Sequence, residues 1–382
     1  MFGMDRNNDK DNVRRGQDPA PYDMEKDPAP YDAENGPVPQ NAGRAPAPRG
    51  YFQSLLSKPR KAVSGIVFTG AIVAMLLMSL VFSLTVAVVG VALEMSVEDV
   101  MQTEAYKYCA YLLYQIALAA IVAVYMKVYR ERPRAFGWRG THWRFFLIGL
   151  ALACGLLFSL NWLNDYVIKF FGLIGYEAPA SSLPSVQGFG LAGVLLVVAV
   201  LPAVFEETVF RGIVLEGIKD VGTVAACLLG GLLFSVFHQS PAQTAYQFVC
   251  GAAYTLLAIR AGSLLPAAMM HFVNNALIVL DVRFGFLSGV TGGGAAALYA
   301  VSGVCLAAAL AWLIFLEKDG GKGGPRIPKK GTKKKDAAEV GEAAAQGGAK
   351  PKGAVKPFLL AALPGLILCA VLWIYNFIGG LG

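Results

Sequence analysis

Two adjacent carboxylates, Glu206 and Glu207, lie at the end of an apolar run, residues 191–205, that is long enough to enter a bilayer. An ionisable side chain inside a membrane segment costs at least about 2.5–3.5 kcal/mol on insertion scales, so such groups are kept mainly where they are paired or functional. Arg211 follows Glu207 by four residues, and the two side chains therefore share a helix face in the favourable acid-before-base order. We predict a structural Glu207–Arg211 ion pair, which leaves Glu206, about 100° round the helix, available for chemistry.

Three more polar side chains lie in the apolar runs that follow. His238 comes four residues after Phe234, and Asn275 comes four residues after His271, so each pair shares one helix face. A carboxylate in a low-dielectric pocket is suited to act as a general base on water, and a nearby histidine can hold that water or shuttle its proton. A histidine and an amide on one face supply donors to a developing oxyanion. Together with Glu206, this set predicts hydrolysis of an amide or ester bond by activated water.

The spacing allows Glu206 and His238 to meet at one depth in the membrane. They are 32 residues apart, and the polar break between them is residues 219–222. Two antiparallel helices joined at this break place both side chains about 16 residues, or about 24 Å, from the turn. The first of these helices must then continue past its apolar part as an amphipathic extension, residues 212–219. Pro202 has no N–H and is expected to bend the same helix just before the site.

Each of these features also has a purely structural interpretation. A buried Glu–Arg pair, a lone intramembrane histidine and an asparagine in a span can each serve only to hold helices together. Asn274 is the alternative to Asn275 as the amide that accompanies His271. A shared site is favoured because the strongest polar exceptions all fall between residues 206 and 275 at consistent spacing. The sequence offers no nucleophile setting of the GxSxG type.

The composition is that of a membrane protein. Of 382 residues, 55% are hydrophobic and 15% are charged, and the mean hydropathy is +0.52, whereas a soluble protein is nearer to about a quarter charged. We predict an all-α polytopic membrane protein with about eight to nine transmembrane helices and a four-helix catalytic core. The fifth and sixth segments are short and rich in small residues, and we expect them to pack inside the bundle. The nine segments are residues 62–93, 108–126, 145–163, 191–210, 223–238, 244–259, 264–282, 295–316 and 358–377.

The basic residues indicate how the chain is oriented. The net charge is +7, but Lys and Arg gather in the tails and in loops between apolar runs, which favours membrane topology over nucleic-acid binding. The loop 127–144 holds six basic side chains and is predicted to be cytoplasmic. The acidic loop 94–104 is predicted to face outward. The protein is therefore expected to be a multi-pass protein of the cell membrane with its N-terminus in the cytoplasm, its C-terminus outside and no nucleic-acid partner.

Composition also divides the chain into parts. The tail contains DPAPYD twice, at residues 18–23 and 27–32. All six cysteines lie in apolar runs without metal-binding spacing, and we expect them to be small core or lipid-facing residues. The predicted parts are a disordered Pro-rich tail (1–57), N-terminal transmembrane helices (58–184), a catalytic core (185–282), an additional transmembrane helix (283–316), a basic flexible linker (317–356) and a C-terminal transmembrane helix (357–382).

Three ordered motifs give the chain a family resemblance. EExxxR, FxxxH and HxxxN resemble the CAAX-protease and bacteriocin-processing (CPBP) family of intramembrane proteases, whose eukaryotic members remove the last three residues of prenylated CAAX proteins. Flanking residues agree, notably Phe210 to Gly212 and the stretch RAGSLLPAAMMH before the third motif. The resemblance covers residues 185–282. It implies Glu206 as the base, His238 as its partner, His271 and Asn275 as the oxyanion side, and Glu207, Arg211 and Phe234 as supporting residues.

The resemblance leaves a metal-dependent alternative open. Glu206, His238 and His271 could form a His₂Glu zinc set. HExxH is absent and Asn275 is a poor zinc ligand, so we expect no cofactor and keep zinc as the alternative.

The function favoured by the sequence is an intramembrane endopeptidase acting on a peptide or membrane protein at the lipid bilayer. Prenylated substrates are not implied, because the tail repeat and the basic linker resemble those of a bacterial chain. The alternative is a non-catalytic protein, either for bacteriocin self-immunity or a membrane scaffold, that binds a peptide partner through the same cavity. A transporter ranks behind both, since the spans show no inverted repeat.

Overall fold

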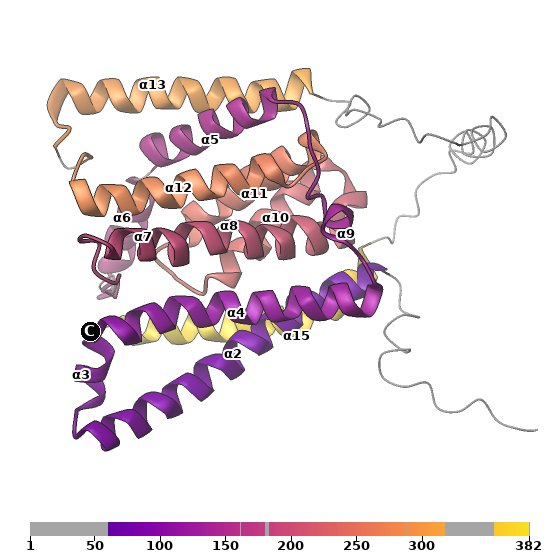
Figure 1. Ribbon diagram of the computed structural model, residues 1–382. Helices are drawn as coiled ribbons and strands as arrows, with labels where there is room; N and C mark the ends of the chain where they lie inside the picture. The colour runs from indigo at the N-terminus through magenta and orange to yellow at the C-terminus, as the bar shows by residue number, and fades with distance from the viewer. Residues whose placement is uncertain (1–59, 161, 180–182, 288, 318–354, 382) are drawn as a thin grey trace, which may run out of the picture. The chain divides into compact units, whose positions relative to one another are not determined.

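The computed structural model describes residues 60–160, 162–179, 183–287, 289–317 and 355–381, in which the regular structure is helix and no β-strand forms (Figure 1). The predicted tail (1–57) and most of the predicted linker (317–356) lie outside these residues. The helices are α2 (Arg60–Leu93), α3 (Val97–Gln102), α4 (Glu104–Tyr129), η1 (Pro133–Phe136), α5 (Arg144–Leu160), α6 (Trp162–Gly172), α7 (Gly190–Val194), η2 (Leu195–Val200), α8 (Leu201–Glu207), η3 (Thr208–Val214), α9 (Leu215–Ile218), η4 (Lys219–Val221), α10 (Thr223–Phe237), α11 (Thr244–Ala261), α12 (Leu265–Phe284), α13 (Gly292–Ala311), η5 (Trp312–Leu316) and α15 (Lys356–Gly379).

Seven segments of the described chain are long and apolar enough to cross a membrane, which confirms an all-α polytopic membrane protein. The number is below the eight to nine predicted, because α10 has only 15 residues and the more polar α11 falls outside the set. The seven segments are Arg60–Leu93, Glu104–Tyr129, Arg144–Gly172, Gly190–Val221, Leu265–Phe284, Gly292–Leu316 and Lys356–Gly379.

Helices α10 and α11 pack against each other inside the bundle, as their small residues predict. Their backbones approach closely at two glycines. A Cβ atom on Gly231 would lie 2.6 Å from the carbonyl oxygen of Phe248, and one on Gly251 would lie 2.8 Å from Cβ of Phe234. This close packing seats Phe234, which precedes His238 by one helical turn, against α11.

The segment Gly190–Val221 is one continuous helical run with two wide turns. The π-helical η2 ends just before Pro202, where the Leu201 N–H donates to the Leu196 carbonyl. The bend predicted at Pro202 therefore takes the form of a π-helical turn, a local widening that is frequent at functional sites. A second π-helical stretch, η3, follows Glu207 directly. The helix continues to Ile218, which confirms the predicted extension beyond the apolar part.

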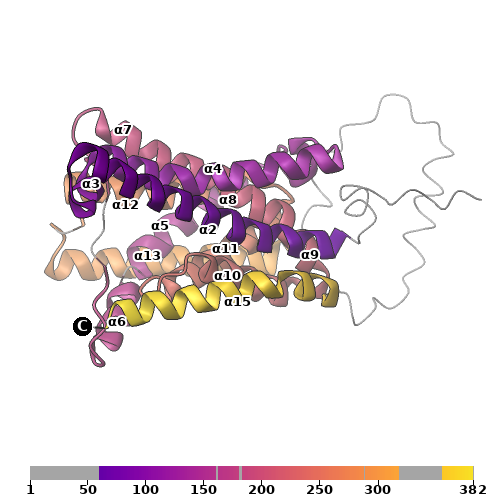
Figure 2. The ribbon, with the colours of Figure 1, turned by 90° about the horizontal axis from the view of Figure 1, so that it is seen from below.

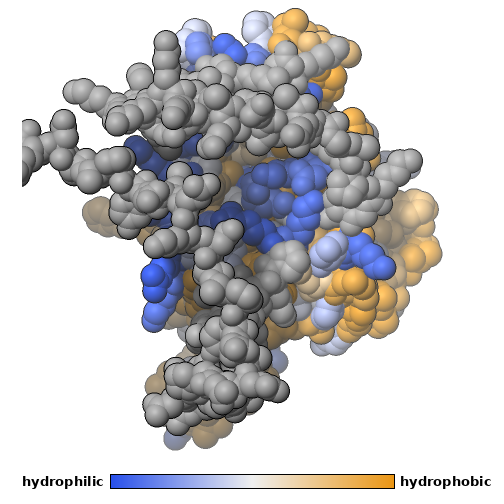
Figure 3. Space-filling model, turned by 90° about the vertical axis from the view of Figure 1, so that its right-hand side faces the viewer, coloured by the Kyte–Doolittle hydropathy of each residue, from blue (hydrophilic) through white to orange (hydrophobic). Residues whose placement is uncertain are grey.

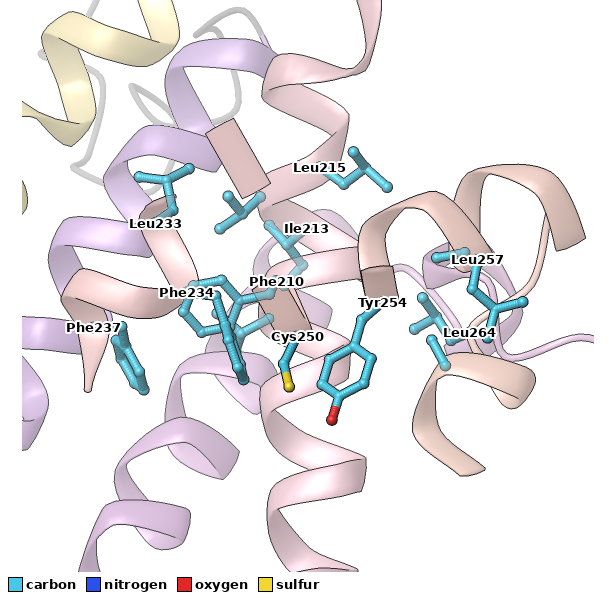
Figure 4. Close-up of a cluster of buried hydrophobic side chains, with 14 of the residues drawn as sticks. Phe210, Ile213, Leu215, Leu233, Phe234, Phe237, Cys250, Tyr254, Leu257 and Leu264 are labelled. Carbon is cyan, nitrogen blue, oxygen red and sulfur yellow. The ribbon is translucent and has the colours of Figure 1, made fainter. Parts of the chain in front are cut away.

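The remaining helices pack around this run on two sides. Helix α2 packs against both α4 and α15, and α13 packs on α5 on the other side of the site helices (Figures 1 and 2). The buried core between them includes aromatic side chains from η3, α10 and α11, among them Phe210, Phe234 and Tyr254 (Figure 4). The rings of Phe210 and Phe234 meet edge to face at 5.2 Å.

The two ends of the bundle differ in charge. At one end Arg60 pairs with Glu131 at 2.8 Å, which brings the start of α2 beside the basic loop between α4 and α5. Hydrophilic side chains gather on this end and are bordered by hydrophobic ones (Figure 3). We call it the basic end. The opposite end, which carries Glu94 and, in α3, Glu98, is the acidic end (Figure 1). The structure thus separates the basic loop from the acidic loop, as the predicted topology requires.

Candidate active site

A single cavity of about 560 Å³ is lined by all four predicted catalytic residues. Glu206 comes from α8, His238 follows the last residue of α10, and His271 and Asn275 come from α12. The prediction that three separate helices deliver these side chains to one pocket is confirmed, while their catalytic roles stay predictions. Further polar and tyrosine side chains that line the cavity are Tyr111, Tyr114, Gln115, Asn164, Gln239, Gln243, Tyr246, Gln247, Tyr254 and Asn274.

Glu207 and Arg211 form the buried ion pair that their spacing predicts. The distance from Arg211 Nη1 to Glu207 Oε1 is 2.8 Å, and the two side chains are 1% and 0% exposed. Arg211 Nη2 also donates to the Gly251 carbonyl at 3.0 Å, and the guanidinium lies 4.5 Å from the ring centre of Phe234. A buried ion pair persists when further hydrogen bonds satisfy its charges. Glu207 and Arg211 therefore tie α8 and η3 to α11 and α10.

His271 connects this ion pair to Glu206. Its Nδ1 lies 2.9 Å from Glu207 Oε1, and its ring stacks on Tyr254 with the centres 5.2 Å apart. Because the Glu207 oxygen accepts from Arg211 as well, Nδ1 of the histidine must carry the proton. The other nitrogen, Nε2, faces Glu206 Oε2 at 3.9 Å. The sequence paired His271 with Asn275 and did not reveal this link to both carboxylates.

Glu206 lines the cavity and has one carboxylate oxygen without a hydrogen-bond partner among the described residues. The residue is 8% exposed, and its Oε1 accepts from Gln115 Nε2 at 3.4 Å. The buried Oε2 has no hydrogen-bond partner among the described residues. Since nearly all buried polar atoms in folded proteins are hydrogen-bonded, an exception of this kind marks a place where a molecule such as water is expected. Gln115 was missed by the sequence reasoning, although it is a polar residue within the predicted span 108–126.

His238 is oriented by the motif residue that precedes it. Its Nδ1 lies 2.7 Å from the Phe234 carbonyl oxygen, and the two rings are 4.6 Å apart. A carbonyl can only accept, so Nδ1 is the protonated nitrogen and Nε2 carries the lone pair. The four-residue spacing of FxxxH thus sets the tautomer of the histidine through the backbone as well as placing both side chains on one face.

Asn275 supports the backbone opposite it. Its Nδ2 donates to the Val198 carbonyl at 2.9 Å, a carbonyl that cannot receive an α-helical hydrogen bond from Pro202. Its Oδ1 accepts from Asn274 Nδ2 at 3.2 Å, and Asn274 Oδ1 accepts from the Tyr246 hydroxyl at 2.8 Å. One N–H of Asn275 is therefore committed to η2, and the amide has a second N–H for a ligand in the cavity.

The structure also bears on metals and cysteines. Within the described ranges no group of three His, Cys, Asp or Glu side chains is placed to hold a metal ion. The predicted zinc set of Glu206, His238 and His271 shares the cavity, and zinc binding by it remains to be tested. All six cysteines are free; Cys250 and Cys369 are buried, as expected of small core residues.

Comparison with known proteins gives one match. Residues 188–277 match the family described as type II CAAX prenyl endopeptidase Rce1-like. The matched range contains all three motifs and the residues of the cavity from Val197 to Asn275. No curated protein and no solved structure matches the chain. The match agrees with the family resemblance of the three motifs and supports a role as an intramembrane protease.

Proposed function

We propose that this multi-pass membrane protein, whose residues 188–277 match the Rce1-like endopeptidases, hydrolyses a peptide bond with a water molecule activated by Glu206. The observation that carries the proposal is the buried Oε2 of Glu206, which lines the cavity without a hydrogen-bond partner among the described residues. A carboxylate in this setting accepts a proton from water as the water oxygen attacks the carbonyl carbon.

His238 is placed to move the protons. Its Nδ1 donates to Phe234, so Nε2 is the nitrogen that can take up and return a proton within the cavity. When the tetrahedral intermediate collapses, the proton taken from water passes to the leaving nitrogen, and the products are a carboxylate and an amine.

His271 and Asn275 supply the donors for the oxyanion. Because Nδ1 of His271 carries the proton toward Glu207, its Nε2 can donate to the oxyanion only from the imidazolium form. The second N–H of Asn275 is the other donor, while its first N–H stays on the Val198 carbonyl.

The test is the substitution Glu206→Gln, which keeps the size of the side chain and removes the base. We expect cleavage of a quenched-fluorescent peptide library by the purified protein in proteoliposomes to fall by about 10²–10⁴-fold, the usual contribution of a positioned acid or base. Glu216→Gln is the matched control, since Glu216 lies on the same helical run and is 46% exposed. Unchanged cleavage by folded Glu206→Gln would refute the base assignment and favour the non-catalytic peptide-binding alternative.

A further inference from the structure

The cavity extends from the middle of the helix bundle toward the acidic end. On α4, which begins at the acidic end with Glu104, the cavity residues run from Tyr111 to Leu118. Helix α12 begins at the basic end, where Arg139 donates to the Gly262 carbonyl at 2.6 Å. Its cavity residues start at His271 and continue toward the other end of the helix.

The third site helix shows the same direction. Its cavity residues extend from Glu206 back toward Gly190, whose carbonyl accepts from the Tyr108 hydroxyl near the start of α4. Exposure follows this direction, because Glu206 is buried whereas Tyr114 is 43% exposed and Gln243 is also exposed. The cavity therefore opens toward the acidic end.

The cavity wall combines neutral hydrogen-bonding groups with apolar side chains, among them Leu183, Ile278 and Val279. Glu206 is the one carboxylate on its wall, and neither Lys nor Arg occurs among the described residues that line it. Amide side chains both donate and accept hydrogen bonds, which is what the N–H and C=O groups of a peptide chain require. The groups in question are Tyr111, Tyr114, Asn164, Gln239, Gln243 and Gln247.

The charge of the two ends assigns the opening to one side of the membrane. Loops rich in Lys and Arg remain in the cytoplasm during insertion, and the basic end carries the loop 127–144 and the start of α2. We infer that the cavity opens on the extracytoplasmic face and receives a peptide segment from that side. That this segment is a substrate rests on the proposed peptidase activity, whereas the direction of the opening does not.

Cysteine accessibility tests the opening independently of activity. The full chain is expressed with alanine at the four cysteines that are not buried, which are Cys109, Cys154, Cys227 and Cys305. Single cysteines are then introduced by Gln243→Cys at the mouth, Glu98→Cys at the acidic end and Gly140→Cys at the basic end, where a Cβ atom meets open space. A membrane-impermeant maleimide is applied to intact and to permeabilised cells.

We expect Gln243→Cys and Glu98→Cys to be labelled in intact cells, and Gly140→Cys only after permeabilisation. Labelling of Gly140→Cys in intact cells with protection of the other two would overturn the inference. So would protection of Gln243→Cys in cells whose Glu98→Cys is labelled, because the cavity would then not open outward.

A second arm uses a peptide that the purified protein cleaves. Added outside intact cells, this peptide should be cut, and maleimide attached at Gln243→Cys should block the reaction. Cleavage that requires permeabilisation would overturn the inference. Absence of cleavage by the purified protein would count against the peptidase proposal, and the labelling pattern would still decide where the cavity opens.

Discussion

Replacing Arg211 with methionine removes the cation of the buried pair while keeping an unbranched side chain. Glu207, which is 0% exposed, would then remain in the protein interior with the contact to His271 Nδ1 in place of the ion pair. Breaking a buried ion pair in this way destabilises a protein by about 3–5 kcal/mol, because the remaining charge is desolvated without compensation. The lost contacts to the Gly251 carbonyl and the Phe234 ring act in the same direction. We therefore expect Arg211→Met to lose about 3–5 kcal/mol of unfolding free energy.

The double variant Glu207→Gln/Arg211→Met separates charge from shape. It leaves no charge at positions 207 and 211, and glutamine can still accept from His271 Nδ1, so stability should recover toward the wild-type value relative to Arg211→Met alone. The control is Glu216→Gln, which removes one partner of the exposed Glu216–Lys219 pair, where the side chains are 46% and 47% exposed. Exposed pairs contribute at most about 1 kcal/mol, and the control should change stability by no more than that.

The assay is reversible unfolding in mixed detergent micelles, followed by tryptophan fluorescence. If Arg211→Met loses no more stability than Glu216→Gln, the ion pair does not hold the site helices together and the reasoning fails. The same conclusion follows if the double variant is no more stable than Arg211→Met, since the harm would then not come from an uncompensated charge.

Two further predictions concern packing and metal. Gly231→Ala places a Cβ atom 2.6 Å from the Phe248 carbonyl oxygen. We expect this variant to lose about 1–3 kcal/mol of unfolding free energy in the same assay. The control is Gly293→Ala, where a Cβ meets open space, and it should cause no such loss. Peptide cleavage should persist after dialysis against 1,10-phenanthroline, because Glu206 activates water directly in the proposed mechanism; a loss of cleavage that added zinc restores would support the zinc alternative instead.

Local spacing made part of this site predictable. The helix positions follow from apolar length, and the Glu207–Arg211 pair follows from a four-residue spacing on one helix. The contact of His238 with Phe234 is local in the same sense, since a side chain at position i lies beside the backbone of position i−4. For this reason the motifs indicated both the ion pair and the shared pocket.

Contacts between distant helices could not be predicted in this way. Gln115 reaches Glu206 from α4, and no spacing in the sequence relates the two residues. The bond from Asn275 to the Val198 carbonyl is an intermediate case. Because Pro202 has no N–H, the sequence predicts that the Val198 carbonyl lacks its α-helical donor. The sequence does not indicate which helix supplies the donor that replaces it. Two of the nine predicted segments, α10 and α11, fall outside the seven candidate spans; α10 is apolar but has only 15 residues.

The arrangement of the two adjacent glutamates explains why one histidine can serve both. Consecutive residues on a helix point about 100° apart, so Glu207 faces the buried Arg211 while Glu206 faces the cavity. His271 lies between them, with Nδ1 on Glu207 and Nε2 toward Glu206 at 3.9 Å. Any change that moves Glu207 must therefore move the imidazole that faces the proposed base. A variant of the ion pair that still folds should lose activity through the position of His271, without any change at Glu206 itself.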